Sequence, residues 1–102
     1  MSIRSDLLVA ITERCVVQLR YHSDAQDRIV HPHVLYRTGT GKECVDSYQI
    51  AGPTYSGRLP DWRPFDLAKI RRLELLGEHF SAAPGYSPRS RKYKEGIIAR
   101  ID

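Results

Sequence analysis

Cationic and aromatic side chains lie on segments that we expect to form neighbouring strands, an arrangement that suits phosphates and stacked bases. The cations are Arg28, Arg63 and Lys69, and the rings are those of Tyr21 and Tyr48. A guanidinium group offers two parallel hydrogen bonds to a phosphate, and an aromatic face stacks on a base for about 1–3 kcal/mol per base. These five residues predict a site for an anionic ligand, either a nucleotide or a short single-stranded nucleic acid. The competing interpretation pairs the arginines with carboxylates of the same surface, namely Asp24, Asp27, Glu43 and Asp46.

Two histidines flank a proline in His31-Pro32-His33, and alternate residues of a strand face the same side. A histidine in an anion site can change charge near neutral pH, so His31 and His33 join the predicted ligand-binding set. Ordinary surface or half-buried histidines are the simpler interpretation. A metal site that includes Cys44 would need a fourth ligand, and none stands at a suitable spacing. The sequence therefore predicts neither a metal nor a cofactor.

No familiar arrangement of catalytic residues stands in the sequence. Cys15 and Cys44 lack an orienting third group and an oxyanion site at a recognisable spacing. The acidic residues do not form the paired pattern that acid–base hydrolysis requires, and the turn at residues 39–43 is too short for a phosphate-binding loop. We therefore expect a binding protein rather than an enzyme.

The composition of the 102 residues is that of an ordinary globular domain, with 41% hydrophobic and 27% charged residues. The net charge of +4 favours anionic partners only mildly, because 16 cations and 12 anions share the surface. No apolar run approaches the roughly 18 residues of a membrane span, and no signal-like segment opens the chain. Two cysteines are too few for a disulfide framework. We therefore expect a single cytoplasmic domain without membrane association.

Apolar periodicity predicts one helix followed by five short strands. Residues 2–13 carry apolar side chains at three-to-four spacing, and Pro32 requires its strand to lie at an edge or to carry a bulge. Asp66 is placed to cap a single helical turn before the last strand. The predicted strands cover residues 16–21, 28–37, 43–50, 62–65 and 71–76, and the helical turn covers residues 66–70. This pattern predicts a mostly β fold: a small five-stranded SH3-like or Sm-like barrel with an N-terminal α-helix and a helical turn before the last strand.

The chain changes character after Phe80. We assign residues 1–80 to the barrel domain with its helix, and residues 81–102 to a basic C-terminal tail. Breakers and cations fill the first part of this tail, whereas residues 97–101 are rich in isoleucine. A disordered basic tail is one interpretation. The other is a strand docked on the barrel or on a second subunit, because β-branched residues favour strands.

The order of these pieces resembles the WYL domain family, which supplies sensing domains to bacterial transcription regulators. The resemblance covers about residues 8–80. The matching positions are Tyr21, Arg28, Pro32, Leu35, Arg63, Phe65, Leu67, Lys69, Ile70 and Phe80, with Lys69 where the family has an arginine. The naming motif Trp-Tyr-Leu is degenerate, because Glu43-Cys44-Val45 keeps only its apolar third position.

This resemblance implies a non-enzymatic, regulatory ligand-sensing domain linked to transcription regulation, with Arg28, Arg63 and Lys69 at positions that line the family's pocket. It also implies a stand-alone or excised module that works beside a separate DNA-binding regulator chain. The alternative is a protein-interaction or dimerisation module without a small ligand. The degenerate motif, the strand with Pro32 and the isoleucine-rich tail support this alternative, to which a homodimer belongs.

Overall fold

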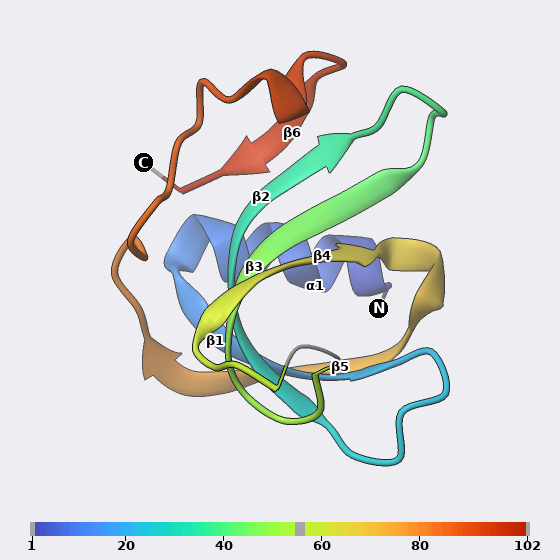
Figure 1. The fold of residues 1–102 in the computed structure, drawn as a ribbon, viewed down its shortest axis with the longest axis vertical. Helices are drawn as coiled ribbons and strands as arrows, with labels where there is room; N and C mark the ends of the chain where they lie inside the picture. The colour runs from blue at the N-terminus through green and yellow to red at the C-terminus, as the bar shows by residue number, and fades with distance from the viewer. Residues whose placement is uncertain (1, 55–56, 102) are drawn as a thin grey trace.

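One helix and six antiparallel strands build the fold (Figure 1). The computed structural model describes residues 2–54 and 57–101. Its elements are α1 (Ile3–Glu13), β1 (Cys15–Tyr21), β2 (Arg28–Arg37), β3 (Glu43–Ala51), β4 (Asp61–Asp66), the 3-10 helix η1 (Leu67–Lys69), β5 (Ile70–His79), the 3-10 helix η2 (Arg91–Tyr93) and β6 (Ile97–Arg100). The predicted mostly β fold with an N-terminal helix is confirmed. No helix within the described ranges is long and apolar enough to cross a membrane.

Local signals set both ends of α1. The Ser2 hydroxyl accepts a hydrogen bond from the Ser5 backbone N–H, and the Ser5 hydroxyl accepts one from the Ser2 N–H in return, which is a capping box. The helix ends at Glu13, and the left-handed backbone of the next residue, Arg14 (φ 56°), turns the chain into β1. Leu7 and Ile11 lie one turn apart and are buried, so α1 presents an apolar stripe to the sheet.

The strands form one sheet in the order β4-β3-β2-β1-β5, and β6 pairs with β2 away from this path. β1 therefore lies between β2 and β5 (Figure 1). In the described part of the chain no ladder joins β4 to β5. The sheet is thus open, and closure into a five-stranded barrel is not confirmed.

Pro32 lies at a change of partner along β2. β3 pairs along most of β2, so β1 and β6 share the opposite edge, where β1 pairs with residues 28–30 and β6 with residues 34–36. Pro32 falls between these two partners, and the β2–β3 register shifts between Pro32 and Val34. A proline has no N–H to offer a ladder and is tolerated at such a bulge. Of the two predicted possibilities, the structure has the bulge, since β2 is an interior strand.

The tail folds back onto the sheet, where β6 lies beside β2 (Figure 1). His33 forms hydrogen bonds with the tail at two places, near its start at Ala83 and near its end at Ile101. Its backbone oxygen accepts a hydrogen bond from the Ile101 N–H at 3.0 Å, and its Nε2 accepts one from the Ala83 N–H at 3.0 Å. The Tyr86 hydroxyl donates to the Ile101 oxygen at 2.8 Å. Ile101 belongs to the same hydrophobic core as Leu7, so the tail is part of the folded domain.

Candidate anion-binding site

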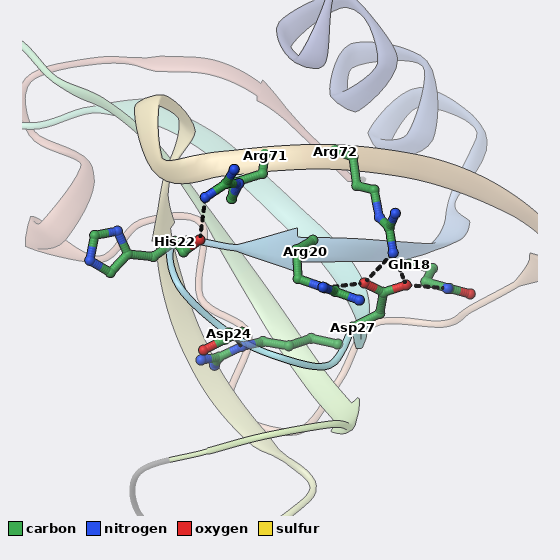
Figure 2. Close-up of polar contacts among 8 residues, drawn as sticks. Gln18, Arg20, His22, Asp24, Asp27, Arg71 and Arg72 are labelled. Atoms are coloured by element: carbon green, nitrogen blue, oxygen red, sulfur yellow. Dashed lines mark hydrogen bonds and ion pairs between the residues drawn. The ribbon is translucent and has the colours of Figure 1, made fainter.

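A hollow of about 410 Å³ lies where β1 runs into the turn that leads to β2, beside the start of β5. We call it the arginine hollow, because three of its lining side chains carry guanidinium groups (Figure 2). Its lining residues are Arg20, His22, Ser23, Asp24, Arg71 and Arg72.

A β-bulge brings the cations of β5 to one side. Arg20 of β1 lies opposite Arg72, whereas the next residue, Tyr21, lies opposite Ile70. Arg71 is thus the extra residue of the bulge, with no residue opposite it in the ladder. Such an extra residue re-aims a side chain that regular alternation would send to the other face. Arg71 and Arg72 consequently both line the hollow, although they are adjacent in sequence (Figure 2).

The turn after β1 closes the hollow on its other side. His22 has a left-handed backbone (φ 50°), a conformation in which histidine is enriched several-fold. Its N–H donates to the Lys69 oxygen at 2.7 Å, and the Asp24 N–H donates to the Tyr21 oxygen at 3.0 Å. These bonds fix His22 and Ser23 next to the start of β5.

Asp27 binds two of the arginines of the hollow, Arg20 and Arg72 (Figure 2). Its Oδ1 accepts from Arg20 Nε at 2.6 Å, its Oδ2 accepts from Gln18 Nε2 at 2.6 Å, and Arg72 Nη2 reaches both oxygens at 3.2 and 3.3 Å. The hydrogen bond from Gln18, followed by those from Arg20 and Arg72, lowers the pKa of Asp27 to about 2. Asp27 is therefore ionised at neutral pH and orients two guanidinium groups.

The hollow keeps an excess of positive charge. Asp24 is already bound by Arg28, whose Nε lies 2.7 Å from Oδ2, and Asp27 serves Arg20 and Arg72 together. Four arginines thus surround two carboxylates, which leaves two positive charges. Arg71 contributes most to this excess. Its Nη1 donates only weakly to the His22 oxygen, at 3.5 Å, and within the described ranges no carboxylate lies at ion-pair distance from it.

Arg28, a residue of the predicted set, is nearly fully buried, with 4% of its surface exposed. Besides its bond to Asp24, it donates to Gln49 Oε1 at 3.1 Å, and its guanidinium carbon lies 5.6 Å from the ring centre of Tyr21. Tyr21 itself is half-buried, packs edge-on against Phe65 and accepts a hydrogen bond from the backbone N–H of Asp66. The competing interpretation made from the sequence, an arginine paired with Asp24, describes Arg28.

The two histidines of the predicted set lie in an aromatic cluster. His33 is fully buried and both of its ring nitrogens are occupied, since Nδ1 lies 2.7 Å from the His31 backbone oxygen and Nε2 accepts from Ala83. His31 stacks on Phe80 with ring centres 4.9 Å apart. Burial lowers the pKa of both imidazoles. Both groups are therefore biased toward the neutral form.

The other predicted residues are spread over β3, β4 and η1. Tyr48 packs edge-on against Trp62, with ring centres 5.5 Å apart. Arg63 Nη1 lies 3.1 Å from Asp61, and its Nη2 donates to Thr54 Oγ1 at 2.6 Å. Lys69 is exposed in η1. None of the seven predicted residues lines the arginine hollow, and direct ligand contact by any of them stays a prediction.

The set predicted from the sequence contains neither His22 nor the three arginines of the hollow, Arg20, Arg71 and Arg72. The signal that could have found them is the pairing of the first strand with the last, because it sets Arg20 beside Arg72. The described part of the chain contains no group of three His, Cys, Asp or Glu residues that could hold a metal ion. Cys15 is buried and Cys44 is half-buried, and burial raises the pKa of the Cys44 thiol.

Comparison with known proteins adds nothing to this site: no protein-family model, curated protein or solved structure matches the sequence. The property that the arginine hollow offers is a fixed set of guanidinium groups with positive charge in excess. That property suits a phosphate or another multivalent anion.

Proposed function

We propose that this protein is a non-enzymatic regulatory domain that binds an anionic ligand, a nucleotide or a short single-stranded nucleic acid, at the arginine hollow. The observation that carries the proposal is the gathering of the half-buried Arg20 and the exposed Arg71 and Arg72 around one hollow that keeps two positive charges in excess. Guanidinium groups suit phosphates because their planar donors match two phosphate oxygens at once.

The size and lining of the hollow favour the phosphate and sugar of such a ligand over its base. A volume of about 410 Å³ falls within the roughly 300–1,000 Å³ of small-molecule sites. Its lining is polar, with the Ser23 hydroxyl and the His22 ring as further hydrogen-bonding groups. Arg71 is the first contact, because a ligand need not displace a carboxylate from it. Arg20 and Arg72 follow if the ligand shares them with Asp27.

The resemblance to the WYL family extends this proposal to ligand sensing in transcription regulation, beside a separate DNA-binding regulator chain. The position of β1 between β2 and β5 supports the resemblance to this barrel family, because closure of a small barrel requires its first strand to pair on both sides. We propose accordingly that the sheet bends into an SH3-like barrel.

A binding titration tests the proposal. A fluorescently labelled oligonucleotide of eight thymidines and a set of nucleoside mono-, di- and triphosphates are titrated at low salt, with fluorescence anisotropy and competition as readouts. Removing an arginine that bonds a phosphate costs about 1.5–3 kcal/mol, so Arg71→Ala should weaken binding by roughly ten- to a hundredfold. Arg89→Ala removes the same charge from the exposed tail and serves as the matched control. Failure of the wild-type chain to bind any of these anions would rule the proposal out.

A second candidate function is a protein-interaction or dimerisation module without a small ligand. The observation that favours it is the exposure of Ile97 (38%) on β6 and of Ile50 (40%) on β3, together with the free outer edges that an open sheet leaves. Such edges can accept a strand from a partner or from a second copy. Light scattering over a range of concentrations tests it, and a monomer at every concentration would contradict the homodimer.

A further inference from the structure

A second hollow, which we call the tail cleft, lies between the tail and strands β3 and β4, apart from the arginine hollow. Its volume is about 180 Å³. It shares no residue with the arginine hollow. The residues that matter for its chemistry are Asp46, Trp62, Tyr86, Lys92 and Tyr93.

A nearly buried carboxylate stands in this cleft. Asp46 is only 3% exposed, and a charge removed from water needs hydrogen-bond donors or a counter-charge in compensation. Its Oδ1 accepts from the Tyr36 hydroxyl at 3.1 Å, and its Oδ2 accepts from the Tyr93 hydroxyl at 2.7 Å. Lys92 supplies the counter-charge, with Nζ 2.9 Å from Oδ2.

These three partners of Asp46 differ in how firmly they are held. The rings of Tyr36 and Tyr93 pack edge-on with centres 4.9 Å apart, so both hydroxyl groups are fixed by packing. The Lys92 side chain is 46% exposed, and its ammonium reaches Asp46 from the end of a flexible four-carbon stem. The ammonium is thus the exchangeable part of the arrangement.

Aromatic faces complete a site for a cation. The Lys92 ammonium lies 5.9 Å from the ring centre of Tyr36, within the range of a cation–π contact. Trp62 and Tyr86 line the rest of the cleft with nearly parallel rings whose centres are 6.4 Å apart. The Trp62 indole is fixed because its Nε1 donates to the Pro84 oxygen at 2.7 Å.

We propose that the tail cleft is a binding site for an alkylammonium group, in which the ligand's ammonium replaces that of Lys92 on Asp46. Lys92 is the internal occupant of this site, and it competes with any external amine. The ligand must carry an N–H, because the Lys92 nitrogen lies 2.9 Å from Asp46 Oδ2, a distance that the methyl groups of a quaternary ammonium ion exclude. A primary or secondary amine therefore binds more tightly than a quaternary ammonium ion. The amine can belong to a free small molecule or to a lysine side chain of a partner.

The single tryptophan of the chain, Trp62, lines this cleft, so intrinsic fluorescence reports on it directly. The full chain is titrated with n-butylammonium, and n-butanol at equal concentration serves as the neutral control of the same shape. The variant Lys92→Ala removes the internal competitor, and Lys94→Ala removes an exposed lysine two residues further along as the matched control. We expect Lys92→Ala to bind n-butylammonium at least tenfold more tightly than the wild type, and Lys94→Ala to bind it like the wild type.

Two further arms sharpen this experiment. Tetramethylammonium should bind Lys92→Ala at least tenfold more weakly than n-butylammonium, because it has no N–H. Nα-acetyl-lysine methylamide tests the peptide source: binding like n-butylammonium assigns the site to lysine side chains, and no binding assigns it to free amines. The proposal is overturned if Lys92→Ala shows no saturable response to n-butylammonium, if n-butanol gives the same response, or if Lys94→Ala gains as much affinity as Lys92→Ala.

Discussion

Replacing Ile101 by alanine tests whether the tail is part of the folded domain. Ile101 is 2% exposed and belongs to the main hydrophobic core. Truncating a buried isoleucine to alanine costs about 2–5 kcal/mol, through lost burial and the cavity that remains. A domain of this size loses roughly 4–8 °C of melting temperature per kcal/mol. We therefore expect Ile101→Ala to melt at least about 8 °C below the wild type.

Ile97 provides the matched control, since it is an isoleucine of the same tail at the start of β6 but 38% exposed. Ile97→Ala loses little burial and should cost less than about 1 kcal/mol. The assay is urea unfolding followed by circular dichroism, with the free energy of unfolding taken from the midpoint and slope. An unchanged slope for both variants shows that the comparison concerns stability alone.

Equal losses for the two isoleucine variants would refute this reasoning. The same holds if Ile101→Ala costs less than about 1 kcal/mol, because a side chain of the core cannot be removed so cheaply. The second result would mean that the tail does not pack on β2 and α1 in solution.

Two further predictions concern buried polar groups. Burial lowers the pKa of His33 from its usual 6.5, so the unfolded state binds more protons than the folded state below that pH. The contribution of His33 to the free energy of unfolding should therefore be fully present above about pH 6.5 and fall as the pH drops through the folded pKa. Midpoints of urea unfolding at pH 7.5 and 5.0 measure this change. A constant midpoint would contradict this. Ser47 is fully buried, and its hydroxyl has no hydrogen-bond partner among the described residues. Ser47→Ala should therefore leave the free energy of unfolding unchanged or raise it by up to about 1 kcal/mol. A clear loss in the same assay would show that the hydroxyl has a partner.

Elements bounded by local turn signals could be predicted from the sequence, whereas those set by distant partners could not. β2 covers the predicted residues 28–37, because polar turn residues stand at both of its ends. β5 continues to His79 rather than ending at Leu76, since His79 pairs with Cys15 at the far end of the sheet. The closed barrel is likewise a long-range property, and an alternating pattern does not decide whether the last two strands of a sheet meet.

The candidate site also has parts that could be predicted from the sequence and parts that could not. The pairing of Arg28 with Asp24 spans four residues and could be read from the sequence as one of two interpretations. The arginine hollow depends on the bulge at Arg71, which comes from the register between β1 and β5. The burial of His33 depends on a contact with Ala83, fifty residues away. Neither the register of two paired strands nor a contact between residues far apart in the chain leaves a signal in the local sequence.

The salt dependence of binding tests the central claim, that an anionic ligand binds at the arginine hollow, most directly. Each phosphate contact with a single strand contributes about 0.7 to the slope of log affinity against log salt concentration. The anisotropy titration with the thymidine oligonucleotide is repeated from low to high salt for the wild type, Arg71→Ala and Arg89→Ala. We predict that Arg71→Ala lowers the slope by about 0.7 and that Arg89→Ala leaves it unchanged. Equal slopes for the wild type and Arg71→Ala, or a larger loss for Arg89→Ala, would contradict binding at this site.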